Sequence, residues 1–136
     1  MDMIDSLHIA SSGMKAQSDR LRIVSENIAN ADSTGTKPGE APYQRKTISF
    51  KNELDREMGV ELVKSEKYGV DNSSFPKKYD PGNPIADEQG YVTYPNVKPM
   101  VEMVDMREAR RGYEANMNVV EVSKSMLMQT ISMIKN

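Results

Sequence analysis

Hydrophobic residues recur at helical spacing at both ends of the chain and are sparse in the middle. Near the N-terminus, a mostly apolar series runs from Met3 to Ala31 in alternating steps of four and three residues. Near the C-terminus, a second series recurs every seven residues from Met106 to Ile134. Such spacing predicts helices that each present a narrow seam, a strip of residues facing another helix. We therefore expect a mainly α fold in which long N- and C-terminal helices pack as a coiled-coil pair.

The residues expected to pack in these helices form two rows on the C-terminal helix and one on the N-terminal helix. The N-terminal row comprises Leu7, Met14, Leu21, Val24 and Ile28. It is expected to pack on a C-terminal row, in the same or a neighbouring chain, that comprises Tyr113, Val120, Leu127 and Ile134. The second C-terminal row comprises Val119, Val122, Met126 and Met133. A helix that is apolar over so wide an arc has several neighbours, so other chains are expected to cover this row.

Three segments follow from this pattern: an N-terminal helix in 1–33, a small irregular β-containing insert in 34–95, and a C-terminal helix in 96–136. Turn-forming residues in 30–39 end the first helix. Short strands are expected at 43–50, 60–68 and 91–94, with a Pro- and Gly-rich loop at 79–84. The second helix is expected to begin near Asn96 or Pro99, because Asn is a good cap and Pro is tolerated in a first turn. It has the pattern to continue to Lys135.

Polar and small residues within the helices carry further information. Gly13 lies inside the first helix, where Gly costs about 1 kcal/mol relative to Ala. It either loosens the helix or lets another backbone approach closely. Asn27, Asn30 and Asn116 are candidates for helix-end or inter-helix hydrogen bonds that fix register, as a buried Asn does in coiled coils.

Composition favours a packing role over nucleic-acid binding. The chain of 136 residues has the length of one domain. With 38% hydrophobic residues, 2 Phe and no Trp, it has few large apolar side chains to form a globular core. The 11 Met residues suit adaptable interfaces. A net charge of -2 argues against a nucleic-acid partner, and the lack of Cys excludes disulfides. We also expect no cleaved secretory signal peptide, because the first residues lack a cationic start followed by a continuous apolar run. We expect no membrane insertion, because no stretch approaches the roughly 18 apolar residues of a membrane span.

Groups that invite a chemical interpretation have simpler explanations. His8, the one histidine, has no partners at metal-ligand spacing. The acidic cluster of 80–88 does not match the spacing of a calcium loop, and we expect a turn-rich loop there. Arg107, Arg110 and Arg111 are offset by nearby acidic residues, some of them three or four positions away, which predicts a solvated face of ion pairs. Those acidic residues are Glu102, Asp105, Glu108 and Glu114. We therefore expect no enzyme, no catalytic residues, no cofactor and no metal.

Several short motifs resemble those of the bacterial flagellar axial family, which includes rod and hook proteins. Ser25–Ser33 (SENIANADS) resembles its N-terminal signature, and Arg110–Met117 (RRGYEANM) followed by Lys124–Leu127 resembles its C-terminal signature. Within that family, several passages of the insert resemble the small proximal-rod subunits: Ala41–Lys46, Asp80–Asp87, Gly90–Val92 and Pro95–Val97. The short insert agrees, because hook and distal-rod members carry larger central domains.

This resemblance implies a structural subunit of the proximal rod, the drive shaft in the periplasmic part of the flagellar basal body. It implies self-assembly through terminal-helix packing, with further copies of the chain, other proximal and distal rod subunits, a rod-base adaptor and a rod-cap protein as partners. It also implies export by the flagellar type III apparatus without a cleaved signal peptide, with the export region in 1–33. An alternative that the residues leave open is a soluble helical adaptor, which would bind a partner helix through its heptad seam.

Overall fold

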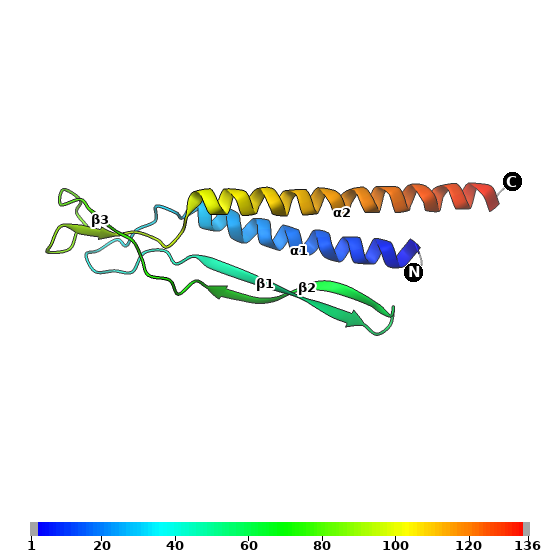
Figure 1. The fold of residues 1–136 in the computed structure, drawn as a ribbon, viewed down its shortest axis with the longest axis horizontal. Coiled ribbons are helices and arrows are strands. Elements are labelled where there is room, and N and C mark those ends of the chain that lie inside the picture. The colour runs from blue at the N-terminus through cyan, green and yellow to red at the C-terminus, as the bar shows by residue number, and fades with distance from the viewer. Residues whose placement is uncertain (1–2, 135–136) are drawn as a thin grey trace. The chain divides into compact units, whose positions relative to one another are not determined.

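The structure, a computed structural model, describes residues 3–134 of the chain. Two helices, α1 (Met3–Ala29) and α2 (Pro99–Ile134), flank four strands (Figure 1). The strands are β1 (Lys46–Asp55), β2 (Val60–Val70), β3 (Lys77–Tyr79) and β4 (Tyr91–Thr93), paired as two two-stranded sheets, β1 with β2 and β3 with β4. The expectation of two terminal helices around a small β-containing insert is confirmed. No helix within 3–134 combines the length and the apolar character needed to cross a membrane.

The chain divides into two compact units, each of which takes segments from both helices. Among the described residues, the first unit contains 3–21, 49–67 and 107–134, and the second contains 22–48 and 68–106. The two units are described separately.

In the first unit, the N-terminal part of α1 contacts both α2 and the β1–β2 hairpin. On one side, Gly13 lies against the Asn116 side chain of α2. On the other side, the Ser12 hydroxyl oxygen accepts a hydrogen bond of 3.2 Å from the Val63 amide in β2. The buried side chains are small, namely Ala10, Ala16, Ala109 and Ser123. Small residues at a helix contact allow the two backbones to approach closely.

The hairpin turn is fixed by Asp55 and Gly59. The Asp55 carboxylate accepts hydrogen bonds from the amides of Glu57 and Met58, at 3.0 and 3.2 Å. Gly59 has a φ of 67°, a left-handed conformation that favours glycine. The expected strand at 43–50 was wrong in its bounds, since β1 begins at Lys46 and continues through the mostly polar residues 51–55, whereas β2 only extends two residues beyond the expected 60–68. An exposed two-stranded ribbon needs no apolar alternation there.

The second unit has its own small core at the base of the insert, with Ile23, Val24, Val92 and Val97 buried. Strands β3 and β4 are antiparallel, and Tyr79 faces Tyr91 with ring centroids 5.3 Å apart. Gly90 precedes β4 with a φ of 83°, and a Cβ there would lie 2.9 Å from the Tyr79 ring. Strand β3 was not expected, because three residues are too few to show a strand period.

Helix α2 begins at Pro99, the second of the two expected starts. Its first turn is closed by the Lys98 carbonyl, which accepts from the amides of Val101 and Glu102. Asn96 does not serve as the cap, because its side chain bonds to the insert instead.

Candidate functional site

Two glycines make close contacts across the seam between α1 and α2 in the first unit. A Cβ on Gly13 would lie 2.8–3.0 Å from the Asn116 side chain, and a Cβ on Gly112 would lie 3.1 Å from Gln17. The Asn116 side chain is held there by a hydrogen bond of 2.9 Å, which its Nδ2 donates to the Gly112 carbonyl of the same helix. Gln17 Oε1 is buried and has no hydrogen-bond partner within residues 3–134. The predicted close approach at Gly13 is thus made by an asparagine side chain, not by a backbone.

The expected packing rows occupy different positions around this seam. Val24 is buried in the second unit, whereas the other members of the N-terminal row are half-buried, namely Leu7, Met14, Leu21 and Ile28. In α2, Tyr113, Val120 and Leu127 are half-buried and Ile134 is 80% exposed. The glycine contacts across the seam thus involve small and polar residues, whereas most of the expected large residues are half-buried.

Substitution of Gly13 tests the close approach. Gly13→Leu is expected to destabilise the chain by about 1–3 kcal/mol, because the added side chain must displace Asn116 from the seam. In an Asn116→Ala background the cost should be smaller, since the displaced group is gone. Thermal unfolding of the two single variants and the double variant gives the coupling. Equal cost in both backgrounds would show that Gly13 and Asn116 do not compete for the same space.

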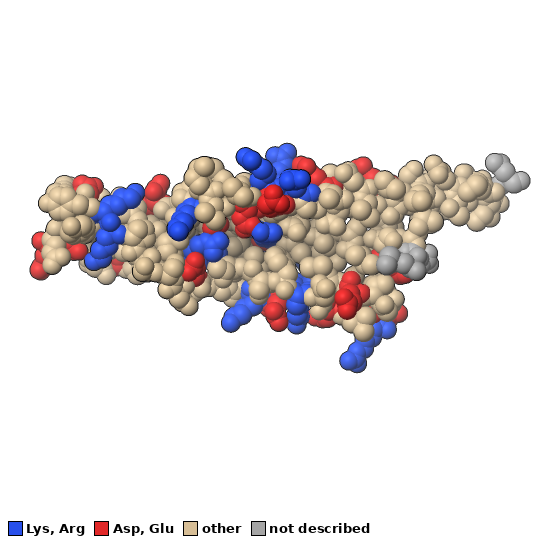
Figure 2. Space-filling view, viewed as in Figure 1, with Lys and Arg blue, Asp and Glu red and all other residues tan. Residues whose placement is uncertain are grey.

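The second α2 row leaves a large apolar surface exposed. Val119, Val122, Met126 and Met133 are 45%, 59%, 54% and 71% exposed. On the face shown in Figure 2, the C-terminal part of α2 is almost free of charged side chains. At 3.6 residues per turn, this row lies about 100° around the helix from the α1-facing side. Contiguous exposed apolar surface is typical of interaction sites, so this row is a candidate interface.

A charged segment precedes that apolar surface on α2. Arg110 pairs with Glu114 at 3.0 Å and Arg111 pairs with Glu108 at 3.6 Å, all with exposed side chains. These residues form the solvated ion-pair face that the sequence predicted. The prediction was wrong for Glu102, which is 0% exposed and belongs to a buried cluster in the second unit.

Asn27 is the centre of that cluster and uses all the hydrogen-bonding capacity of its side chain. Its Oδ1 accepts from the Lys46 amide at 2.8 Å and from the Tyr43 hydroxyl at 2.9 Å. Its Nδ2 donates to the Lys46 carbonyl at 2.9 Å and to Glu102 Oε2 at 3.1 Å. The side-chain amide thus pairs with both backbone groups of Lys46, as a neighbouring strand residue would. Burial also raises the pKa of the Tyr43 hydroxyl.

Glu102 and Arg45 form the charged pair of the cluster. Arg45 Nε donates to Glu102 Oε1 at 2.5 Å, and the Arg45 side chain is 26% exposed. Because the Glu102 carboxylate is buried, it relies on Arg45 and Asn27 in place of water.

A second asparagine, Asn96, joins the insert to the start of α2. Its Oδ1 accepts from the Arg45 amide at 2.8 Å, and its Nδ2 donates to the Asp71 carbonyl at 2.9 Å. Arg45 and Asp71 are themselves paired through the Asp71 amide and the Arg45 carbonyl. The sequence indicated Asn27 as a register residue but gave no sign that Arg45, Asn96 and Glu102 would bond at the same place. No local sequence signal links them, because their partners lie 23 to 75 residues away in the chain.

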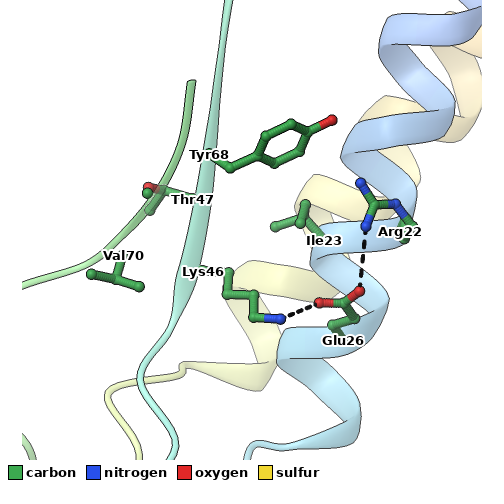
Figure 3. A pocket seen from close by; sticks show the side chains of 8 residues that line it. Arg22, Ile23, Glu26, Lys46, Thr47, Tyr68 and Val70 are labelled. Atoms are coloured by element: carbon green, nitrogen blue, oxygen red, sulfur yellow. Dashed lines mark hydrogen bonds and ion pairs between the residues drawn. The ribbon is translucent and has the colours of Figure 1, made fainter. Parts of the chain in front are cut away.

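An open pocket of about 570 Å³ lies between α1 and the base of the hairpin in the second unit (Figure 3). Glu26 bridges Lys46 at 2.8 Å and Arg22 at 3.7 Å on its rim. The hydrogen bond that Lys46 Nζ donates to the Glu26 carboxylate lowers the pKa of Glu26 and raises the pKa of Lys46. Arg22 also lies over the Tyr68 ring, 5.6 Å from its centroid. These groups are largely paired with one another, so the pocket offers no convergent reactive set.

The remaining polar candidates from the sequence are Asn30, the acidic 80–88 loop and His8. At the end of α1, Asn30 Nδ2 donates a hydrogen bond of 2.8 Å to the Glu26 carbonyl. In the 80–88 loop, the Asp87 carboxylate accepts from the amides of Gln89 and Tyr91, and these bonds lower its pKa. No group of three or more His, Cys, Asp or Glu residues within 3–134 is placed to hold a metal ion. His8 is exposed and lines an open pocket between α1 and β2.

Comparison with known proteins decides the family. Residues 7–37 match the family described as Flagella basal body rod protein, and residues 88–133 match the Flagellar basal body rod FlgEFG protein C-terminal family. The flagellar basal-body rod protein FlgC of Agrobacterium fabrum is 55% identical over 127 residues, covering 93% of this chain and 91% of that protein. The chain belongs to the FlgC family of flagellar basal-body rod proteins.

Other FlgC proteins match over nearly the whole chain. Those of Salmonella typhimurium and Bacillus subtilis are 39% and 38% identical, over 98% and 99% of this chain and 98% and 100% of their own lengths. The resemblance to the small rod subunits is therefore confirmed. FlgC proteins are structural rod proteins and not enzymes, which favours the rod interpretation over the helical adaptor.

Proposed function

We propose that this FlgC-family chain is built into the flagellar basal-body rod through its two terminal helices. In this proposal α1 and α2 pack as a coiled-coil pair, and neighbouring rod subunits cover the exposed apolar row of α2. The single observation that carries the proposal is the exposure of Val119, Val122, Met126 and Met133 beside a seam that α1 already occupies. Each such side chain contributes roughly 1.5–3 kcal/mol when it is fully buried.

The same proposal assigns roles along the chain. Residues 1–33 and 96–136 form the axial helices and 34–95 the insert, with the export region in 1–33. Asn27, Asn30 and Asn116 fix register, since apolar seams alone permit sliding. The partners are other proximal and distal rod subunits, further copies of this chain, a rod-base adaptor and a rod-cap protein. Export through the flagellar type III apparatus without cleavage would bring the chain to a rod in the periplasm. Family membership supports these roles.

A charge on the exposed row tests the assembly surface. Val122→Asp is expected to reduce incorporation into basal bodies at least tenfold and to abolish motility, because burying an unpaired carboxylate costs several kcal/mol. The measurement is quantitative mass spectrometry of purified basal bodies together with swimming in soft agar.

Ser125→Asp is the matched control, since Ser125 is exposed and lies outside the row. It adds the same charge and should leave incorporation unchanged. Normal motility in the Val122→Asp strain would exclude this row as a contact between subunits.

A further inference from the structure

The buried cluster in the second unit joins three segments that are far apart in the sequence. Asn27 comes from the end of α1 and Glu102 from the start of α2. Lys46 is the first residue of β1, and Arg45 directly precedes it. Each segment supplies a polar group that the others need. Without Glu102, one Asn27 N–H and the Arg45 Nε–H lose their acceptor, although the Arg45 guanidinium keeps its ion pair with Asp71. Without Asn27, both backbone groups of Lys46 lose their side-chain partner.

We propose that Asn27, Arg45 and Glu102 form a polar lock, which makes the ordering of β1's first residues depend on the pairing of the α1 end with the α2 start. A partly formed lock leaves buried polar groups without partners, so its complete form is favoured over any intermediate. The lock goes beyond assembly through the α2 row, because all its members belong to one chain.

Hydrogen exchange of the Lys46 amide measures whether the lock is formed. This N–H donates to Asn27 Oδ1, whereas Glu102 contacts the opposite end of the same side-chain amide. A change at Glu102 therefore reaches the Lys46 amide through Asn27 or through Arg45, the residue before Lys46. An exposed ion pair has no such connection, and Glu114 in the Arg110–Glu114 pair provides the contrast.

Hydrogen exchange of the purified full-length chain, resolved to single amides, tests the lock. Glu102→Ala is expected to increase exchange of the Lys46 amide at least tenfold. Glu102→Gln should give a smaller increase, since its single carbonyl oxygen can accept one of the two bonds. Glu114→Ala, the matched control, should leave Lys46 unchanged. The Gly59 amide, which donates to the Asp55 carbonyl in the first unit, monitors wider unfolding.

Each outcome is decisive. Unchanged Lys46 exchange in Glu102→Ala, or an unprotected Lys46 amide in the unmodified chain, would overturn the lock. If Glu102→Ala exposes the Gly59 amide as well, Glu102→Gln decides: faster exchange at Lys46 with Gly59 unchanged supports the lock, and any other result rejects it. Val122→Asp should keep normal Lys46 protection while losing assembly, so failure of the lock and failure of the assembly surface are separable.

Discussion

An Asn27→Asp subunit is expected to lose the fold of its second unit and to give non-motile cells. The substitution removes both donors of the Asn27 amide, which now serve the Lys46 carbonyl and Glu102. It also places a second carboxylate beside the buried Glu102 carboxylate. Breaking a buried polar set in this way costs about 3–5 kcal/mol. Small domains are stable by only about 5–15 kcal/mol, so the loss is a large share of the total.

Thermal unfolding of the purified chain and swimming in soft agar measure this effect. Asn52→Asp is the control, because Asn52 is exposed in β1 and the change of atoms is identical. The control should unfold at the temperature of the unmodified chain and support motility. An Asn27→Asp chain that does the same would show that the four hydrogen bonds of Asn27 contribute little.

A Leu127→Asp subunit is expected to fail in assembly for a different reason. Leu127 is half-buried, one turn beyond the buried Ser123 on the α1-facing side of α2. Loss of its apolar contacts and desolvation of the new carboxylate should together cost about 2–5 kcal/mol. We expect incorporation into basal bodies and motility to be abolished, while export of the chain, measured by immunoblotting of secreted protein, remains intact.

Thermal unfolding separates the two helix surfaces. Leu127→Asp should lower the unfolding temperature of the free chain, whereas Val122→Asp, on the exposed row, should not. Ser125→Asp is again the charge-matched control. Retained motility with Leu127→Asp would show that the seam residue is not needed in the rod.

The helices were predictable because their periodic patterns are long: α1 ends at Ala29, two residues before the apolar series does, and α2 begins at Pro99, one of the two expected starts. Asn27 was predictable as a polar residue on a helix with an apolar pattern. Glu102 was not, since arginines that follow it in α2 suggested a surface ion pair. Its true partner, Arg45, lies 57 residues away, and only tertiary structure brings the two together.

The small residues of the α1–α2 seam were also only partly predictable. Heptad spacing indicated large apolar side chains such as Leu7 and Met14, whereas Gly13 and Gly112 also make close contacts across the seam. A glycine gives no hydrophobic signal, so its packing role appears only when the opposite helix is placed.

The exposed row of α2 also has a chemical vulnerability. Two of its four members are methionines, Met126 and Met133, at 54% and 71% exposed. Peroxide converts an accessible thioether to a sulfoxide, which is polar and disrupts Met-rich interfaces. Burial against a neighbour would shield the same sulfur atoms. In the proposed assembly, oxidation of these methionines before incorporation would weaken the contact with a neighbouring subunit more than oxidation afterwards.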